Sequence, residues 1–179
     1  MQEYHEMTIA GLTRRLPLCR VNEHLRIAAF VIFGDAPLTV RACEELLKKV
    51  PAFDVILTAE AKGIPMGHEL SRQSGKTYFV ARKYPKLYMV DPVAVEVKSI
   101  TTDKKQVLYL DGPEMEYIRG KRVLIADDVI STGESLGALE TLVERSGGQV
   151  VCRAAILAEG DAAKRDDICF LEELPLFFD

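Results

Sequence analysis

The chain has 179 residues, of which 48% are hydrophobic and 28% are charged, and its formal net charge at pH 7 is −4. This length and composition are those of a soluble globular protein with one domain and a substantial core. The acidic balance argues against nucleic acid as the main partner, and no apolar run approaches the roughly 18 residues that a membrane span needs.

Cysteine usage and the N-terminus both indicate a cytoplasmic protein. The four cysteines are far apart and form no CxxC pair, as expected of reduced, buried thiols. The three histidines show no ligand spacing, so a zinc site is not expected. The N-terminal segment MQEYHEMTIAGLTRR carries early acids and no apolar core, so it is not a secretory signal.

Residues 8–33 are predicted to be extended. Two β-prone runs cover residues 16–21 and 25–33, and a turn at Asn22-Glu23 joins them. The two runs indicate a hairpin that lies outside the main sheet. Within the second run, an aromatic side chain such as Phe30 or Phe33 is suited either to the core or to stacking on a base.

A helix and a strand follow this hairpin. The helix should cover Leu38 to Val50, with Asp35 as its cap and Pro51 ending it. The strand covers residues 54–59 and is apolar. After it, the segment EAKGIPMG opens a second helix that runs to about residue 74, so this part of the chain is a strand–turn–helix unit.

Cationic residues stand at the ends of two predicted strands. Ala61, Lys62 and Gly63 follow the first strand, and Arg82 and Lys83 follow the next one, TYFVA. In an open α/β sheet, ligands bind outside the carboxyl ends of the strands. Neighbouring cations and a glycine-containing turn at such a place suit a diphosphate.

Residues 84–112 form a long insert between two predicted sheet strands. Alternating runs at 93–97 and 106–110 flank the polar segment SITTDKK, which indicates a hairpin with a polar tip. An insert of this length in a compact domain is usually functional.

The segment KRVLIADDVISTGESLG, residues 121–137, contains the most informative pattern in the chain. A strand buried on both faces is predicted over Val123–Ala126, and Asp127 and Asp128 follow it. The turn Ser131–Ser135 contains three hydroxyl residues and Gly133, and apolar residues at helical spacing come next.

This order of elements suits a sugar phosphate. The turn presents backbone N–H groups and the positive end of a helix dipole to an anion. It has neither the lysine nor the spacing of a nucleoside-triphosphate P-loop. Asp127 and Asp128 would lie where a sugar joined to that phosphate would lie, and carboxylates accept hydrogen bonds from vicinal hydroxyls.

The C-terminal third contains two more predicted strands. The first covers residues 149–158 and ends at Glu159, which could face a base, and Asp161 is expected to cap a helix. The second is an edge strand over residues 167–171. The tail LPLFF is too apolar to float free, so it should pack on the N-terminal hairpin or on a dimer partner.

The stretch VLIADDVISTGES resembles the motif that binds 5-phosphoribosyl 1-diphosphate (PRPP) in type I phosphoribosyltransferases. The resemblance implies an α/β fold with a central, mostly parallel sheet flanked by helices, an N-terminal β hood and an inserted flexible β-hairpin loop. The single domain, residues 1–179, would comprise a hood at 1–35, a core at 36–172 with its flexible insert at 84–112, and a tail at 173–179. The resemblance also implies a cis peptide near Ala61-Lys62, in the loop that holds the pyrophosphate.

The three strand-end features, which suit a phosphate, a sugar and a diphosphate, occur together in one ligand, PRPP. The implied reaction transfers the phosphoribosyl group to a purine base, with Mg²⁺ carried by PRPP near the two aspartates rather than held in a protein cage. The implied catalytic residues are Asp127, Asp128, Lys62, Arg82 and Glu96, with Phe33 and Glu159 at the base. The implied PRPP-binding residues are Ala61, Lys62, Gly63, Arg82, Lys83, Lys86, Asp127, Asp128, Val129, Ser131, Thr132, Gly133, Glu134 and Ser135.

The resemblance favours adenine as the acceptor base, with xanthine as the alternative. The hypoxanthine-guanine branch has an Asp at the position of Ser131, whereas the residues Ala-Arg-Lys and Glu159-Gly160 are more similar to the adenine and xanthine enzymes. The FP-PGI-F-D pattern usual in adenine enzymes is absent. A PRPP-sensing regulator is the alternative from another class, although the chain lacks a helix-turn-helix segment. Homodimers are common in the resembled family.

Overall fold

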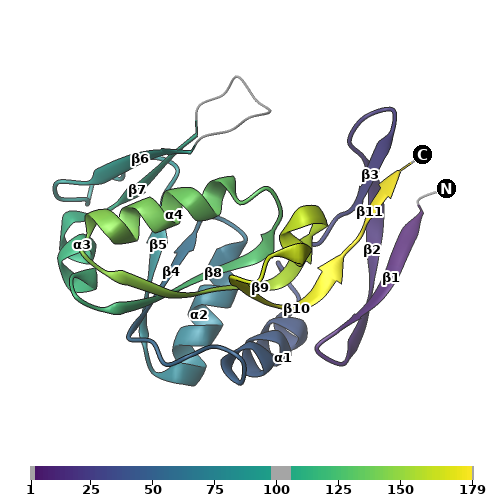
Figure 1. Cartoon of the computed structure of the whole chain (residues 1–179), viewed down its shortest axis with the longest axis horizontal. Coiled ribbons are helices and arrows are strands. Elements are labelled where there is room, and N and C mark those ends of the chain that lie inside the picture. The colour runs from purple at the N-terminus through teal and green to yellow at the C-terminus, as the bar shows by residue number, and fades with distance from the viewer. Residues whose placement is uncertain (1–2, 98–105, 179) are drawn as a thin grey trace.

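The computed structural model describes residues 3–97 and 106–178. Its core is a five-stranded sheet in the order β10-β9-β8-β4-β5, in which every neighbouring pair is parallel (Figure 1). The strands are β4 (Val55–Ala59), β5 (Thr77–Ala81), β8 (Arg122–Ile130), β9 (Gln149–Glu159) and β10 (Ile168–Leu174). This confirms the predicted fold class.

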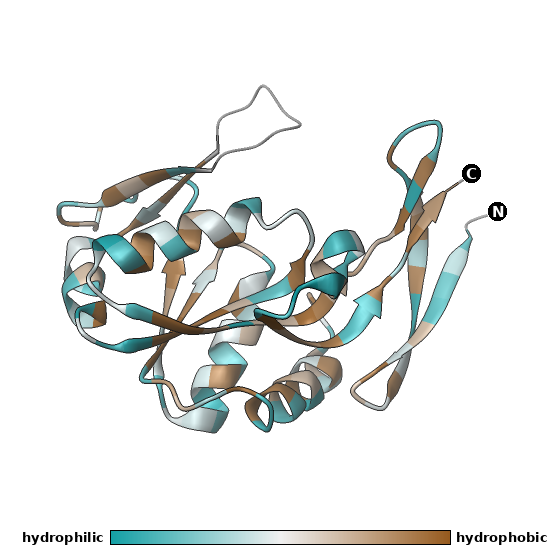
Figure 2. Cartoon of the chain, in the orientation of Figure 1, coloured by the Kyte–Doolittle hydropathy of each residue, from teal (hydrophilic) through white to brown (hydrophobic). Residues whose placement is uncertain are grey.

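Helices cover both faces of the sheet. The helices are α1 (Ala36–Leu47), α2 (Gly63–Ser74), α3 (Gly112–Ile118) and α4 (Glu134–Arg145), and a short 3-10 helix, η1, covers Gly160–Lys164. One face packs against α3 and α4 and the other against α1 and α2, so the core consists of two apolar layers. Figure 2 shows hydrophobic residues concentrated along the central strands.

A second sheet lies beside the core and is called the hood sheet here. It has the order β1-β2-β3-β11 and is formed by β1 (Tyr4–Ile9), β2 (Leu12–Arg20), β3 (Leu25–Ala28) and β11 (Leu176–Phe178). Two predictions were incomplete. The predicted strand at 25–33 ends at Ala28, because Phe30 and Ile32 turn into the core and are buried. The tail is itself a strand of this sheet.

The predicted insert contains an antiparallel hairpin formed by β6 (Val93–Val97) and β7 (Gln106–Leu110). Its polar tip, residues 98–105, lies outside the described residues. The hairpin packs on α4 and joins the core sheet through backbone hydrogen bonds of 2.7 and 2.8 Å between Arg82 and Tyr109. In Figure 1 the hairpin and the hood sheet stand at opposite ends of the core.

Several predicted boundaries were wrong. The first helix begins at Ala36, two residues before the predicted start, and ends at Leu47, three residues before the predicted end. Helix α3 was not predicted, although Asp111, Pro113 and Glu114 form a usual helix start, in which Glu114 accepts a 3.2 Å hydrogen bond from the Asp111 N–H. Asp161 is not a cap: it lies in the first turn of η1 and pairs with Lys164.

The strand order places a topological switch point between β4 and β8. From β4 the chain continues outward to β5, whereas from β8 it continues in the other direction to β9 and β10. Loops after two such strands diverge to opposite faces and leave a crevice at their carboxyl ends. Strands β4 and β8 are those that precede the Ala61–Gly63 turn and the Ser131–Ser135 turn. None of the described helices is long and apolar enough to cross a membrane.

Candidate active site

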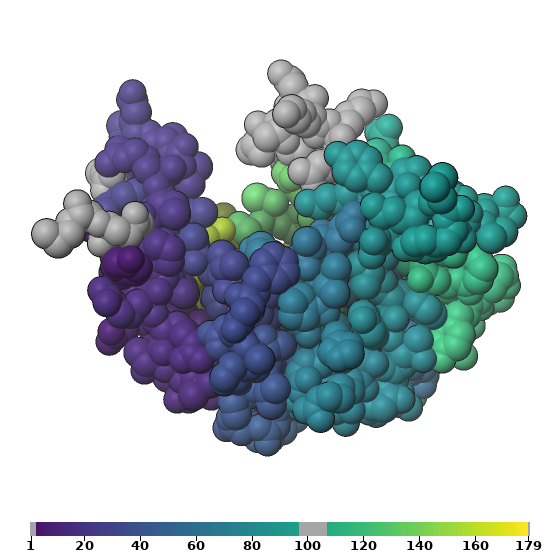
Figure 3. Space-filling view, turned by 180° about the vertical axis from the view of Figure 1, so that it is seen from behind, coloured from purple at the N-terminus to yellow at the C-terminus, as the bar shows by residue number. Residues whose placement is uncertain are grey.

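The carboxyl edge of the sheet lies in a hollow of the molecular surface. Figure 3 shows this hollow between the hood sheet and the part of the chain that contains the β6–β7 hairpin. Atoms from the second half of the chain, in green and yellow, form the visible floor. The predicted site residues on β4, β5 and β8 therefore share one edge of the molecule.

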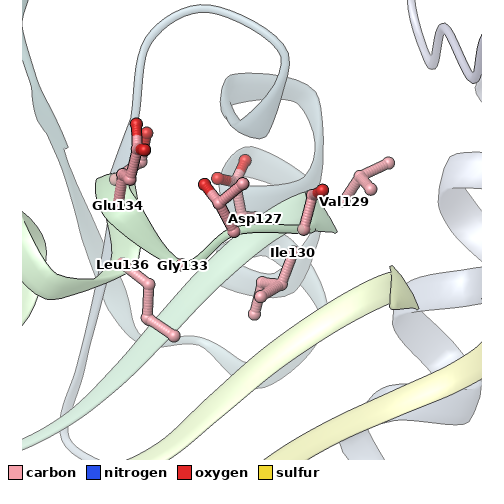
Figure 4. A pocket seen from close by; sticks show the side chains of 9 residues that line it. Asp127, Val129, Ile130, Gly133, Glu134 and Leu136 are labelled. Atoms are coloured by element: carbon pink, nitrogen blue, oxygen red, sulfur yellow. The ribbon is translucent and has the colours of Figure 1, made fainter. Parts of the chain in front are cut away.

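The turn after β8 has the geometry expected of an anion site. Gly133 has φ of +79° and stands directly before α4, a conformation that glycine adopts without strain. A cavity of about 130 Å³ lies at this turn and is lined by Asp127, Val129, Ile130, Ser131, Thr132, Gly133, Glu134, Ser135 and Leu136. In Figure 4 the carboxylates of Asp127 and Glu134 lie on one side of the turn, whereas Ile130 and Leu136 point the other way.

The two adjacent aspartates are part of strand β8, which continues to Ile130 and so is longer than predicted. Both carboxylates reach the turn after β4, where a Cβ at Gly63 would lie 3.1 Å from Asp127 Oδ1 and where Lys62 contacts Asp128. Asp127 lines the cavity at the turn of residues 131–135. Asp128 is 3% exposed, and its Oδ2 lies 2.9 Å from Lys62 Nζ. The Asp128 N–H also donates a 2.9 Å hydrogen bond to Asp127 Oδ1.

The acid pair has unusual electrostatics. Burial, together with the negative charge of Asp128, raises the pKa of Asp127 to about 7. The charge of Lys62 opposes this rise in pKa but is the smaller effect. The surroundings of Asp127 therefore favour its neutral form, and a bound cation would favour the ionised form.

The turn after β4 places Lys62 at the same edge. Lys62 is the residue before α2, and its Nζ is also 3.5 Å from the carbonyl oxygen of Phe30, in the segment that joins the hood sheet to the core. A cis peptide bond joins Glu60 and Ala61, one residue before the predicted position. The turn thus brings Lys62 into contact with Asp128 of β8.

Arg82 and Lys83 end β5 beside this turn, and Glu60 links them to it. Arg82 Nε lies 3.3 Å from Glu60 Oε2, and the backbone N–H of Lys83 donates to Glu60 Oε1. Glu60 was not predicted as a site residue. The only indication in the sequence was its position at a strand end, immediately before Ala-Lys-Gly. Glu60 holds the Arg82 guanidinium against the β4 turn.

Buried polar atoms without hydrogen-bond partners gather at this edge. Within residues 3–97 and 106–178, three buried side-chain atoms make no hydrogen bond: Thr58 Oγ1, Arg82 Nε and Asp128 Oδ2. The last two lie at ion-pair distance from their neighbours, and Thr58, which was also missed, has no polar partner. Most buried polar groups in proteins are hydrogen-bonded. Their concentration here is what a site for a polar ligand would show.

Other predicted site residues are farther from this group. Glu96 lines a separate cavity of about 350 Å³ beside α4, together with Thr132, Gly133 and Glu134. Phe33 is 52% exposed at the surface, and Phe30, the other aromatic candidate, belongs to the core. Glu159 ends β9 at the carboxyl edge. The structure places Lys86 in the segment between β5 and β6, where its backbone N–H lies 3.4 Å from Met89 Sδ.

Gly63 lies in close contact with β4 and β8. A Cβ at this position would lie 2.1 Å from Thr58 Oγ1 and 3.1 Å from Asp127 Oδ1. We predict that Gly63→Ala lowers the free energy of unfolding by about 1–3 kcal/mol through overpacking. The matched control is Gly137→Ala, since a Cβ at Gly137 in α4 meets nothing within 4 Å. Urea unfolding measures both variants, and equal stabilities would contradict the close packing of β4, α2 and Asp127.

Comparisons with known proteins agree on one family. The model of the phosphoribosyl transferase domain matches residues 32–174. A hypoxanthine/guanine phosphoribosyltransferase of Methanosarcina mazei is 38% identical over 108 residues, which are 60% of this chain and 53% of that protein. One of Methanococcus voltae is 37% identical over 112 residues, which are 63% and 56% of the two chains. The chain thus matches only about half the length of these relatives.

Solved structures of adenine phosphoribosyltransferases have the same fold. The enzyme from Thermoanaerobacter pseudethanolicus superposes with a TM-score of 0.67 at 22% identity, and the match covers 97% of this chain and 95% of that one. The enzyme from Leishmania donovani gives a TM-score of 0.66 at 22% identity, covering 97% and 76% of the two chains. At this level of identity the likeness is one of fold.

Proposed function

Because the chain belongs to the phosphoribosyl transferase domain family, we propose that it transfers the phosphoribosyl group of PRPP to a purine base, giving a nucleoside monophosphate and pyrophosphate. One observation carries the proposal. The phosphate turn, the acid pair and the Lys62 turn converge at the switch point between β4 and β8. PRPP has a phosphate, a ribose and a diphosphate in the order that these three groups would bind.

The proposed roles follow from charge and hydrogen bonding. Backbone N–H groups and hydroxyls of residues 131–135 would hold the 5-phosphate, and the aspartates would accept from the ribose hydroxyls. Lys62, Arg82 and Lys83, with the N–H groups of Ala61 and Gly63, would hold the diphosphate. A nitrogen of the base forms the new bond to the anomeric carbon and loses its proton to solvent, the bond to the diphosphate oxygen breaks, and its electron pair leaves with the pyrophosphate. Asp127 and Asp128 would stabilise the positive charge that develops on the ribose ring.

The acid pair also fits a bound Mg²⁺, which prefers carboxylate oxygens and keeps several waters. Asp127 and Asp128 are adjacent acids. Burial and the charge of Asp128 raise the pKa of Asp127, and a bound cation would oppose that rise. In the described part of the chain no three His, Cys, Asp or Glu side chains form a metal cage. The other metal ligands would therefore come from PRPP and water, and the metal would supply neutralisation of the departing pyrophosphate.

We propose two candidates for the acceptor base, and a different observation favours each. Adenine follows from the residue pattern, since Ser131 stands where the hypoxanthine-guanine branch has an Asp. Hypoxanthine or guanine is favoured by relatives of that name, which match at 34–38% identity and so more closely in sequence than the adenine enzymes do. The proposed domain is residues 1–179, and a homodimer remains our expectation for its assembly.

The decisive experiment mixes purified protein with PRPP, Mg²⁺ and one of adenine, hypoxanthine, guanine, xanthine and orotate, and follows pyrophosphate release. We expect release with at least one purine and none with orotate. The rank order of kcat/KM decides between the two proposals for the base. Binding of PRPP without release for any base would instead favour a PRPP-sensing regulator.

Thr132 gives a test of the phosphate turn. We predict that Thr132→Val raises the KM for PRPP roughly tenfold, the worth of one hydrogen bond to a charged group. Thr141→Val is the matched control, because the Thr141 hydroxyl donates to the Gly137 carbonyl within α4 and does not line the cavity of the phosphate turn. Steady-state kinetics that give Thr132→Val the wild-type KM for PRPP would contradict the assignment of this turn.

A further inference from the structure

The chain passes between the hood sheet and the core at two places. At the first, residues 29–35 lead from β3 into α1. At the second, Pro175 alone separates β10 of the core sheet from β11 of the hood sheet. Figure 1 shows the yellow end of the chain crossing from the core to lie beside β3. The C-terminal strand is therefore a second connection between the two sheets.

Strand β3 depends on β11 for one of its two edges. It has four residues and pairs with β2 through three of them. On its other side Leu176, Phe177 and Phe178 pair with Ile27, Arg26 and Leu25. A short strand with one partner is marginal, and a second partner also covers an exposed edge. The Phe177 ring adds an edge-to-face contact with His5 of β1, at 5.2 Å between centroids.

Leu176 also touches the core at the carboxyl end of β9. Its Cδ1 lies 3.0 Å from the point where a Cβ of Gly160 would stand. Gly160 has φ of +59°, so this turn uses the lack of a side chain both for its backbone conformation and for the close approach of Leu176. The residue before it is Glu159, which also pairs with Leu174 of β10.

Residues 29–35, which follow β3, contact the turn at Ala61–Gly63. Phe30, two residues after β3, is buried, and its carbonyl oxygen is the one that lies 3.5 Å from Lys62 Nζ. A loss of Leu176 packing would free the Glu159–Gly160 turn, whereas residues 29–33 are held independently by Phe30 and Ile32, which are buried in the core. The Glu159–Gly160 turn stands at the carboxyl end of β9, beside the end of β8, where Ile130 pairs with Ala158.

We propose that β11, through Leu176, is a positioning strand that holds the hood sheet against the Glu159–Gly160 turn and so fixes the part of the site that receives the base. The proposal rests on the proposed function for its kinetic readout. It assigns no chemical step to Leu176. The turn at residues 131–135 and the acid pair lie on β8 and before α4, whereas β11 pairs with β3 of the hood sheet, so PRPP binding should be independent of β11.

The test compares Leu176→Ala with Phe178→Ala, a matched control on the same strand whose side chain is 74% exposed. We expect Leu176→Ala to raise the KM for the preferred purine on the order of tenfold, as displaced positioning groups do, with the KM for PRPP unchanged. Phe178→Ala should keep both wild-type values, and Leu176→Met, which conserves volume, should restore the KM for the base. A parallel rise in both KM values, or no rise, would overturn the positioning role.

Hydrogen exchange supplies a readout that does not need turnover. In Leu176→Ala the amides of residues 25–28 should lose protection, whereas those of β8 should keep it. If the wild-type protein releases no pyrophosphate with any purine, the proposed function fails, and exchange alone then decides the positioning role. Unchanged protection of β3 would overturn it.

Discussion

Asp128→Asn should lower kcat/KM for pyrophosphate release by on the order of 10²–10³-fold, the usual loss when a preorganised charge is removed from a reacting centre. The Asp128 carboxylate is 3% exposed and lies 2.9 Å from Lys62 Nζ. In such a buried position a charge acts more strongly than in water. Asparagine keeps the shape of the side chain and removes the negative charge that would face the cationic ribose ring.

The matched control is Asp54→Asn, since Asp54 also pairs with a basic residue but stands just before β4, at the opposite edge of the sheet. Asp54 Oδ1 lies 2.8 Å from the Arg122 guanidinium. Its loss should leave kcat/KM within about twofold, because surface pairs of this kind contribute little beyond stability. Equal activities for Asp128→Asn and the wild type would remove the acid pair from the mechanism.

Lys62→Met combined with Asp128→Asn tests whether the two residues act as one unit. Because their side chains are in contact, each single change removes part of the same interaction. The double variant should then lose less activity than the product of the two single losses. Strictly multiplicative losses would mean that the two residues act on different parts of the substrate.

The local signals of the sequence predicted the core sheet and the strand–turn–helix unit at residues 122–145 correctly. A buried run followed by two acids, hydroxyls and Gly133 was enough to predict β8, its turn and α4, because each feature depends on neighbours in the chain. The same holds for β4 and α2. These elements contain most of the candidate site, which is why the predicted fold class was confirmed.

Features that depend on distant residues were missed. The apolar tail was expected to pack on the N-terminal hairpin and does so, but its strand pairing with β3 joins residues about 150 positions apart, and no local pattern specifies that partner. Glu60 and Thr58 resembled ordinary residues at a strand end, and their importance follows only from Arg82 and Gly63 being packed against them. Helix α3 was missed for another reason, since its start signal was present but lay at the end of the long insert.

Asp127→Asn should give opposite effects on activity and stability. Activity should fall, because Asp127 lines the cavity of the phosphate turn and would accept from the ribose hydroxyls. Without Mg²⁺ or PRPP, stability should rise at pH 8 by up to about 4 kcal/mol, because the variant no longer ionises a buried acid beside another acid and each unit of pKa difference is about 1.4 kcal/mol. Denaturant unfolding without Mg²⁺ or PRPP measures the second effect.

The pH dependence identifies the cause of that gain. Folding raises the pKa of Asp127 to about 7, whereas an unfolded aspartate titrates near 4. Between these values the folded state keeps a proton that the unfolded state has lost, so this group's contribution to stability is full below about pH 4 and is lost as the pH rises through 7. The advantage of Asp127→Asn over the wild type should therefore be larger at pH 8 than at pH 5.

Asp54→Asn again provides the contrast, because its side-chain hydrogen bond with Arg122 lowers the pKa of Asp54. A lowered pKa contributes stability above the unfolded value and loses it only in acid, so the cost of Asp54→Asn should be the same at pH 5 and pH 8. If Asp127→Asn showed the same pH-independent difference, the acid pair would be solvated and ordinary. A gain that grows with pH, together with lost turnover, would mean that the folded protein keeps an unfavourable charge at this position because the ligand requires it.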